Sequence, residues 1–322
     1  MDLESIKSHI TTETSLLESE ILERIKTKVE LINTLSGHIL SGGGKRLRPS
    51  LLFLAQKACS EKGEKIIEAG VVVEFIHAAT LLHDDVVDQS KIRHGEKTAN
   101  NIWGNPGAVL VGDFLYSRAF EIIVEINNPR VYEILAHTTN IISQGEVLQL
   151  MNLNNPDMDE KIYLEIINRK TARLFQTSAE IGSILSGDDT QKSKALANYG
   201  YHFGMAYQLR NDLLDYFGDE KITGKNLVED FSEGKLTLPL IHAIKVSNNN
   251  ERDLIKTAIQ KSDLGRMQDI LQILKEKKIE KYIQDKIILE TNNAIDSLKV
   301  LSESIYKKDL IKLAEYCSER ER

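Results

Sequence analysis

Acidic side chains are concentrated in the segment HDDVVDQSKIRHG, residues 83–95, directly after a long apolar run. Asp84, Asp85 and Asp88 come first, and the cation Arg93 follows them. Positions four apart on a helix share a face, because each residue turns the helix by about 100°. We therefore expect Asp84 and Asp88 on one face and Asp85 to one side of it. Carboxylates in this arrangement can bind a hard cation such as Mg²⁺.

A second acidic cluster lies in QLRNDLLDYFGD, where Asn211, Asp215 and Asp219 follow the same four-residue step and Asp212 stands beside them. Like charges on one helix face destabilise it by roughly a few tenths of a kcal/mol per pair. Mg²⁺ would remove that cost, because it takes one or two carboxylates and leaves other positions for water and substrate phosphates. Two such helices facing each other predict a clamp for a Mg²⁺-diphosphate. The alternative is two solvated acidic faces.

The elements that carry these residues are predicted to be helices. Apolar side chains recur at three-, four- and seven-residue steps in the first thirty residues, which predicts an amphipathic helix; these are Ile6, Ile10, Leu17, Ile21, Ile25 and Val29. Further helices are expected over 66–88, from Pro129 onward, over 159–185, over 191–217 and as a set over 250–320, with a loop at 41–50 that enters a helix near Pro49. No hairpin signal of the Asn-Gly or Asp-Gly type is present. We predict an all-α fold.

Composition limits the possible domain number, binding partners and cellular location. The five Pro are widely spaced and no Ser/Gly/Pro-rich linker occurs, which favours one domain over residues 1–322. A formal net charge of −7 disfavours nucleic acid as a partner. The spacing of Cys59 and Cys317 suggests neither a metal site nor a disulfide framework, so we expect a cytoplasmic protein. The first residues are acidic and polar, unlike a signal peptide, and no uncharged apolar stretch predicts a membrane span.

The sequence resembles the trans-isoprenyl (polyprenyl) diphosphate synthases, and among them the bacterial octaprenyl-type enzymes. The matching stretches run from about residue 37 to residue 241 in family order: GGGKRLRPSLL, EFIHAATLLHDDVVDQSKIRHG, VLVGDFLYSRAF, SQGEVLQL, RKTARLF, AYQLRNDLLDYFGD and GKNLVEDFSEGKLTLPL. The resemblance implies a single-domain helical bundle around a deep central cavity, and a homodimer. It also implies a prenyltransferase that condenses isopentenyl diphosphate with an allylic diphosphate.

The resemblance assigns roles to residues at both acidic motifs. It implies three Mg²⁺ ions with substrate bound, held by Asp84, Asp88, Asn211, Asp212 and Asp215, and it places Asp84, Asp85, Asp88, Lys170 and Lys225 in the catalytic machinery. The allylic diphosphate is expected to bind Arg93, Lys170, Thr171 and Gln208. Lys225 and Lys235 lie in a Gly-spaced stretch that is expected to close over the phosphates and exclude water.

Isopentenyl diphosphate needs a pocket of its own, and the resemblance places it at Lys45, Arg48 and His77. His77 lies seven residues before Asp84 and hence on its helix face, which favours the site over a role in the core. His83 lies on another face and is expected to be structural. Arg46 and Lys91 receive no role.

Two positions depart from the family pattern. The family usually has a second Arg where this chain has His94, which could bind isopentenyl diphosphate when protonated or as a neutral donor. We therefore predict that His94→Arg lowers the Michaelis constant for isopentenyl diphosphate between pH 6 and 8. The second motif usually begins with Asp, and the amide of Asn211 offers Mg²⁺ an oxygen with less charge. We predict weaker Mg²⁺ binding there than in an Asn211→Asp variant.

Product length is expected to depend on Ala79 and Thr80, two small residues before the first motif. In the family, bulky aromatic side chains there block the tunnel for the growing tail. Small side chains imply a long, octaprenyl-like product, although close helix packing also favours them. The expected primer is farnesyl or geranylgeranyl diphosphate, and the expected use is quinone side chains, with transient membrane contact for product release.

Two rival functions retain the acidic motifs. A class I terpene cyclase would need no second diphosphate pocket, and GGGKRLRP together with His77 argues against it. A non-catalytic subunit of a heteromeric synthase typically loses the first motif, which is intact here.

Overall fold

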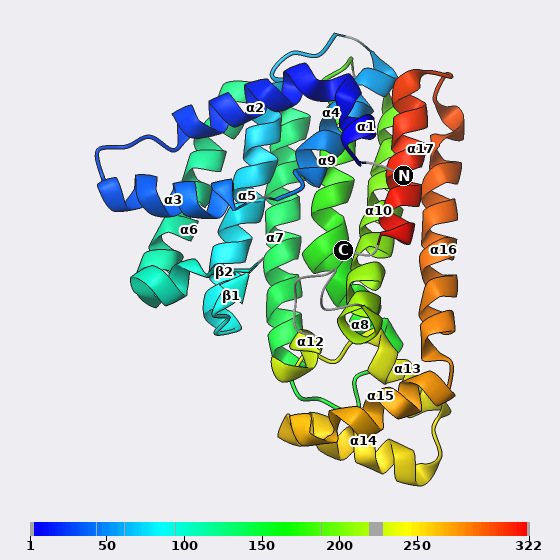
Figure 1. Ribbon diagram of the computed structural model, residues 1–322. Coiled ribbons are helices and arrows are strands. Elements are labelled where there is room, and N and C mark those ends of the chain that lie inside the picture. The colour runs from blue at the N-terminus through cyan, green and yellow to red at the C-terminus, as the bar shows by residue number, and fades with distance from the viewer. Residues whose placement is uncertain are drawn as a thin grey trace. The chain divides into compact units, whose positions relative to one another are not determined.

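The computed structural model describes residues 3–42, 44–60, 62–93, 95–187, 189–218 and 228–320. Helices make up most of these ranges (Figure 1), which confirms the expected all-α class. The chain divides into two compact units. The first comprises Met1–Thr139, Leu174–Gly200 and Ser297–Leu313, and the second comprises Asn140–Arg173, Tyr201–Asp296 and Ala314–Arg322. The single domain expected from the sequence stays a prediction.

Most elements fall within one of these two units. The first unit contains α1 (Leu3–Lys7), α2 (Thr11–Arg24), α3 (Glu30–Ser41), α4 (Leu47–Cys59), α5 (Ile66–Val87), β1 (Ile92–Arg93), β2 (Glu96–Lys97) and α6 (Ala99–Ile126). The second contains α8 (Glu160–Ile167), α12 (Glu229–Ser232), α13 (Leu238–Val246), α14 (Asn249–Lys261) and α15 (Met267–Glu276). The other long helices are α7 (Pro129–Met151), α9 (Arg173–Ile184), α10 (Thr190–Phe217), α16 (Ile279–Ser297) and α17 (Ile305–Glu319).

Helix α5 is the central element of the first unit. It packs against α2, α3, α4 and α6, and its apolar side chains are buried nearly all round the helix, as expected for a core helix. It is the one helix in the described ranges that is long and apolar enough to cross a membrane, and 67% of that apolar stretch is buried inside the protein. Gly112 of α6 lies so close to α5 that an added Cβ would be 2.3 Å from Nε2 of His83. His83 therefore lies against α6 with its side chain 33% exposed, and its expected structural role stays a prediction.

The N-terminal helix is shorter than the sequence predicted. A 3₁₀ turn at Ser8–Ile10 separates α1 from α2, and α2 ends at Arg24. Leu17 and Ile21 are buried as expected, but Val29 is 55% exposed and lies outside the helix. The hydroxyl of Thr27 accepts a hydrogen bond of 2.8 Å from the backbone N–H of Val29. Such a local bond competes with helix formation, which explains the error.

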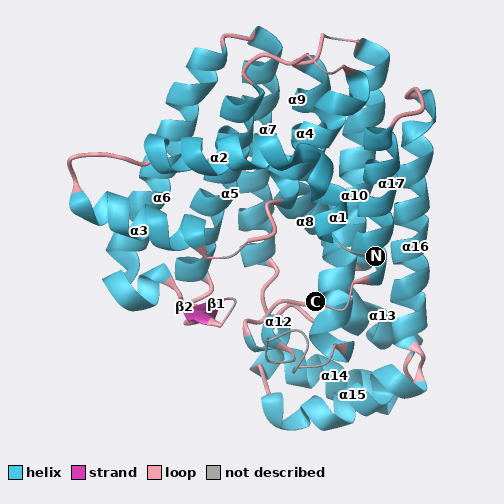
Figure 2. Ribbon diagram, turned by 45° about the horizontal axis from the view of Figure 1, so that its top comes forward, coloured by secondary structure: helices cyan, strands magenta, loops and turns pink. Residues whose placement is uncertain are grey.

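Two local features were not predicted. The expected helix over 159–185 is interrupted by a π-helical turn, Asn168–Ala172, of the kind often found at functional sites. A hairpin of two residues per strand, with Ile92 opposite Lys97 and Arg93 opposite Glu96, follows the first acidic motif. Figure 2 shows it as the one magenta segment in the described part of the chain. Its turn contains Gly95 at φ 82°, a conformation that glycine adopts without strain.

Candidate active site

The first acidic motif lies at the C-terminal end of α5. Asp84 and Asp85 belong to the helix, and Asp88 follows it with helical backbone angles, its N–H donating to the carbonyl of Asp84 at 2.8 Å. The four-residue spacing of Asp84 and Asp88 is thus realised in the backbone. Their expected role as Mg²⁺ ligands stays a prediction.

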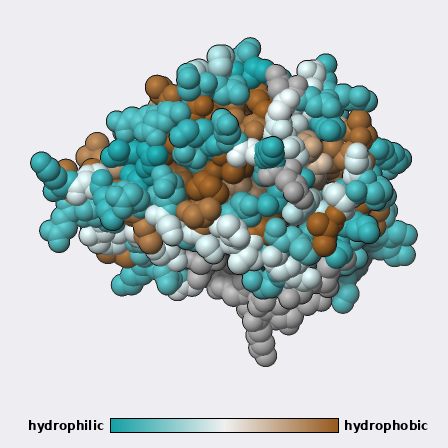
Figure 3. Space-filling model, turned by 90° about the horizontal axis from the view of Figure 1, so that it is seen from above, coloured by the Kyte–Doolittle hydropathy of each residue, from teal (hydrophilic) through white to brown (hydrophobic). Residues whose placement is uncertain are grey.

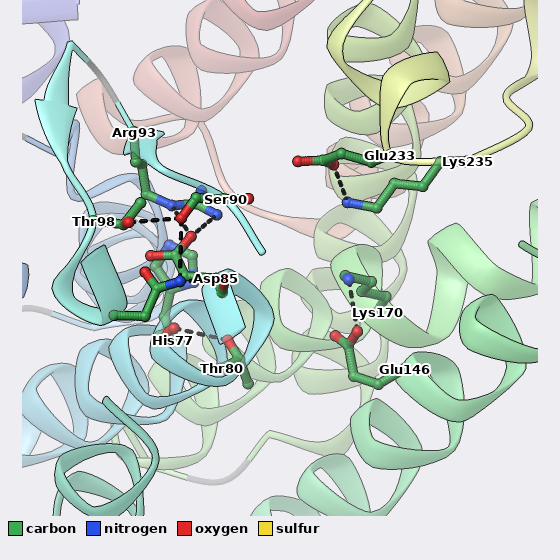
Figure 4. A network of polar contacts seen from close by, with 11 residues as sticks. His77, Thr80, Asp85, Ser90, Arg93, Thr98, Glu146, Lys170, Glu233 and Lys235 are labelled. Atoms are coloured by element: carbon green, nitrogen blue, oxygen red, sulfur yellow. Dashed lines mark hydrogen bonds and ion pairs between the residues drawn. The ribbon is translucent and has the colours of Figure 1, made fainter. Parts of the chain in front are cut away.

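Asp85 forms an ion pair with Arg93. The Nε and Nη2 atoms of Arg93 lie 2.9 and 2.8 Å from the same carboxylate oxygen, Oδ1 of Asp85, and Figure 4 shows the two side chains pointing toward each other. Asp85 is 1% exposed, and burial raises the pKa of its carboxyl group although Arg93 opposes the shift. Its other oxygen, Oδ2, is buried and has no hydrogen-bond partner among the described residues. That oxygen is suited to serve as a ligand of a cation.

The hairpin β1–β2 positions Arg93. It is attached to the first motif by Thr98, whose hydroxyl donates to the carbonyl of Ser90 at 2.7 Å and whose N–H donates to the carbonyl of Lys91 at 3.1 Å. Arg93 is therefore held close to the end of α5 by a tightly bonded turn. His94 lies outside the described residues.

Two of the three residues expected to bind isopentenyl diphosphate, Arg48 of α4 and His77 of α5, are in contact. Nη1 of Arg48 lies 3.1 Å from Nε2 of His77, and the Arg48 guanidinium stacks over the Phe175 ring at 4.3 Å. Arginine only donates, so Nε2 of His77 must be the acceptor. Lys45 is half-buried in the loop that precedes α4.

A cavity of about 90 Å³ in the first unit is lined by His77, Asp85 and Arg93, but not by Arg48 or Lys45. Its polar lining comes from His38, Arg46, Glu74, His77, Asp85, Arg93, Glu96, Lys97 and Thr98. Sequence reasoning missed His38 and Lys97, which lie far apart in the chain and match no motif quoted for the family. Arg46 is structural: it forms ion pairs with Glu74 at 2.5 Å and Glu18 at 2.9 Å and donates to the Leu40 carbonyl.

The second motif lies on α10 in the second unit. Asp212 is 2% exposed, and both of its oxygens accept hydrogen bonds, from Tyr163 Oη at 2.6 Å and Gln208 Nε2 at 2.7 Å. Thr171 in turn donates to Gln208 at 3.0 Å. Burial and the charge of Asp212 raise the pKa of Tyr163 well above its usual value, so this phenol stays a donor. Asp212 thereby fixes the orientation of Gln208 and Thr171, two residues expected to bind the allylic diphosphate.

Asp215 lies one helical turn after Asn211. Its Oδ1 atom accepts a hydrogen bond of 3.0 Å from the N–H of Glu229, whereas Oδ2 is buried without a partner in the part of the chain described. Burial, and then the charge of Asp230, raise the pKa of Asp212 to about 7 and that of Asp215 to about 8. Burial and the repulsion among these carboxylates therefore favour the protonated forms of Asp212 and Asp215 when no cation is bound. Asp219 and Lys225 lie outside the described residues.

The two described lysines expected at the allylic site each contact a carboxylate. Lys170, on the π-helical turn, donates to Glu146 at 2.6 Å and to Gln149 at 2.8 Å, and Lys235 donates to Glu233 at 2.7 Å (Figure 4). A cavity of about 40 Å³ in the second unit is lined by Gln149, Tyr163, Gln208, Asp212, Asp230 and Lys235, among others. Lys235 therefore lies at the same cavity as the second motif.

Asn211 has an unexpected partner. Its side-chain oxygen accepts a hydrogen bond from Nη2 of Arg320, at the end of α17. The expected role of Asn211 as a metal ligand stays a prediction.

Residues 29–276 match the polyprenyl synthetase family. The chain belongs to this family. It is 40% identical to octaprenyl diphosphate synthase of Escherichia coli over 100% of both chains, and 38% identical to the nonaprenyl diphosphate synthase of Rhodobacter capsulatus over 98% of both. Its structure is similar to that of a polyprenyl synthase from Caulobacter crescentus complexed with calcium and isoprenyl diphosphate, with a TM-score of 0.96, 36% identity and coverage of 100% and 98%.

These findings confirm the expected function class. Like the polyprenyl synthetases that it matches over its full length, the protein is a trans-prenyltransferase, and the terpene cyclase and non-catalytic subunit are the less favoured alternatives. Within the described residues no three His, Cys, Asp or Glu side chains are placed to hold a metal on their own. In each unit, one buried carboxylate oxygen without a partner among the described residues (Oδ2 of Asp85 in the first, Oδ2 of Asp215 in the second) is nevertheless suited to be one ligand of a divalent cation that completes its coordination with water and phosphate.

Proposed function

We propose that this polyprenyl synthetase condenses isopentenyl diphosphate with an allylic primer, farnesyl or geranylgeranyl diphosphate, and makes an octaprenyl-like product. The main support is that two separate sets of residues, each expected to bind a diphosphate, are held together by hydrogen bonds within one chain. Arg48 and His77 contact each other in the first set, while Thr171, Gln208 and Asp212 form a continuous hydrogen-bonded chain in the second. A cyclase would need only the second of these sets.

Each set has a separate task in the reaction. Lys45, Arg48 and His77 bind isopentenyl diphosphate. Arg93 and Lys170 bind the allylic diphosphate, and Lys170 exchanges Glu146 for a phosphate oxygen when substrate arrives. A guanidinium and an ammonium at the leaving group stabilise the negative charge that develops as it departs.

The bonds that change are those of an ionisation, a condensation and an elimination. The allylic C–O bond breaks and diphosphate leaves with the electron pair. The double bond of isopentenyl diphosphate then forms the new C–C bond to the allylic cation, and the departed diphosphate accepts the proton that is lost. Water exclusion by the segment around Lys235 protects the cation from being quenched to an alcohol.

Magnesium is the cofactor that we propose, with three ions bound beside substrate. When bound, Mg²⁺ gathers the negative charge of the leaving diphosphate and so eases its departure. Asp84 and Asp88 of the first motif and Asp215 of the second would supply carboxylate ligands. Asp85 holds Arg93, and Asp212 holds Gln208.

The size of the side chains on α5 is expected to limit product length. Ala79 is fully buried, whereas Thr80 is half-buried and donates to the carbonyl of His77 at 2.7 Å. Thr80 thus lies one turn before Asp84, where a larger side chain could stop the growing tail. We propose that these small residues permit the long product, which would serve quinone side chains.

We also infer a homodimer in the cytoplasm that contacts a membrane transiently for product release. Apolar patches are visible among hydrophilic residues on the face shown in Figure 3. On α6, Leu110 and Val124 are 67% and 69% exposed and Phe120 is 45% exposed. Exposed apolar side chains of this number on one helix favour association with a second copy. Sedimentation of a Leu110→Glu variant at half the wild-type mass would support this, and an unchanged dimer would remove α6 from the interface.

An elongation assay tests the proposed function. Purified protein is incubated with Mg²⁺, labelled isopentenyl diphosphate and either primer, and products are read by mass spectrometry. Products that grow by one five-carbon unit at a time, and are lost in Asp84→Asn, support the synthase. A cyclised hydrocarbon, or tight substrate binding without turnover, would contradict it.

A further inference from the structure

Arg320 joins the end of α17 to the helix that carries the second acidic motif. Besides the hydrogen bond to the Asn211 side chain, its Nη2 atom lies 3.3 Å from the carbonyl of Tyr207, and its guanidinium stacks over the Tyr207 ring at 4.2 Å. The Arg320 carbonyl accepts a hydrogen bond of 2.8 Å from Nε of Arg210. Contacts on both the side chain and the backbone therefore hold Arg320 in one position.

Among the described residues, the hydrogen-bond partners of the Arg320 guanidinium are neutral groups. The residue is 8% exposed, its side-chain partners are an amide and a carbonyl, and its Nε atom is buried without an acceptor in the described part of the chain. An amide offers only a partial negative charge to a guanidinium, whereas Asp at position 211 would form an ion pair. A positive charge is thus fixed one helical turn before Asp215.

This arrangement conflicts with metal binding at Asn211. A divalent cation at the Asn211 oxygen would have to share it with the guanidinium and would be repelled by the charge of Arg320 at close range. At Asp215 the ligand is a carboxylate instead of an amide, and its Oδ2 atom is buried with no partner among the described residues.

We propose that Arg320 is a positioning residue that takes the place of a metal ion at Asn211. The Arg320 guanidinium occupies the side-chain oxygen of Asn211, and the contact aligns α10 with the end of α17. Asp215 then supplies the metal ligand of the second motif. This inference rests on the proposed function, because it says that Arg320, and not a metal ion, supplies the positive charge at Asn211 beside the substrate diphosphate. It replaces the simpler expectation that Asn211 is a weak Mg²⁺ ligand.

Manganese binding tests the proposal without turnover. Mn²⁺ replaces Mg²⁺, inorganic pyrophosphate replaces substrate, and electron paramagnetic resonance counts the bound ions and their affinity. The variants are Asn211→Asp, Arg320→Gln and the double variant. Arg320→Lys is the matched control, because it retains the charge, and thermal unfolding checks that each variant is folded.

The proposal predicts a strongly non-additive result. In Asn211→Asp the new carboxylate pairs with Arg320, so Mn²⁺ affinity changes by less than about threefold. In the double variant the carboxylate is released, and the affinity of the weakest site rises by at least about tenfold over either single variant. Asn211→Asp with Arg320→Lys should behave like Asn211→Asp alone. An equal gain in Asn211→Asp and in the double variant would overturn the proposal.

The Mn²⁺ measurement and the elongation assay can fail independently of each other. Failure of elongation in the wild-type protein would refute the synthase but leave the Mn²⁺ pattern unaffected. Normal elongation together with additive Mn²⁺ affinities would refute the role of Arg320 alone. Two results together would also overturn the proposal. These are a lower thermal stability of Arg320→Gln and equal Mn²⁺ binding in Asn211→Asp and in the double variant. They would show that Arg320 serves only packing.

Discussion

Arg93 directs two hydrogen bonds to a single oxygen of Asp85, and the other oxygen of that buried carboxylate has no donor among the described residues. The pair joins the end of α5 to the hairpin that follows it. Its geometry makes Asp85 the residue that places the Arg93 guanidinium, and through it the expected contact with the allylic diphosphate.

Asp85→Asn should therefore affect both stability and substrate binding. The amide cannot neutralise Arg93, so we expect the free energy of unfolding to fall by about 1–3 kcal/mol. The loss is smaller than for a fully buried ion pair, because the Arg93 side chain is partly exposed. The Michaelis constant for the allylic primer should rise more than that for isopentenyl diphosphate. Urea unfolding and steady-state kinetics measure the two effects. Asp88→Asn is the control for stability, and an equal loss in that variant would argue against the pair.

The metal-free protein should become less stable as the pH rises from 5 to 8. Burial raises the pKa of Asp212 to about 7 and that of Asp215 to about 8, whereas unfolded Asp titrates near about 3.9. Between these values the folded state binds more protons than the unfolded state, so its stability is greatest at low pH and falls by up to about 1.4 kcal/mol per pH unit for each group.

Chemical unfolding in EDTA at each pH measures this slope. Asp215→Asn should reduce it, because the amide does not titrate. A slope that is the same in wild type and in Asp215→Asn would show that Asp215 titrates at its ordinary pKa.

The contact between Arg48 and His77 predicts different effects for two substitutions of His77. His77→Gln keeps an acceptor for Arg48, whereas His77→Ala removes it and leaves a donor without its partner. We expect the Michaelis constant for isopentenyl diphosphate to rise by about tenfold or more in His77→Ala and clearly less in His77→Gln. The value for the allylic primer should stay constant in both. Equal effects of the two variants on both substrates would show that His77 serves only packing.

Thr80 offers the clearest test of product length. Thr80→Tyr places an aromatic ring one turn before Asp84 and should shift the products to shorter chains at similar total incorporation of isopentenyl diphosphate. Thr80→Val is the control, because it keeps the size and removes the hydrogen bond to the His77 carbonyl. A shift in Thr80→Val as large as that in Thr80→Tyr would attribute the effect to His77 rather than to side-chain size.

The helices and the spacing of the motif residues could be predicted from the sequence, because both depend on periodicities of a few residues. Asp84 and Asp88, for example, have the predicted four-residue helical spacing. It missed the Tyr163–Asp212 and Asn211–Arg320 contacts, which join positions 49 and 109 residues apart. It also missed the hairpin at Ile92, because strands of two residues carry no alternating pattern. Pairing at long range is set by packing, which a single sequence does not display.

The most direct test of the account is a crystal structure with Mg²⁺ and a non-hydrolysable thio-analogue of the allylic diphosphate. The account predicts Mg²⁺ ions bound to carboxylate oxygens of Asp84 and Asp88 and to the diphosphate, with the Arg93 guanidinium in contact with a phosphate oxygen. A diphosphate bound away from Asp84 and Asp88, or bound there without metal, would contradict it.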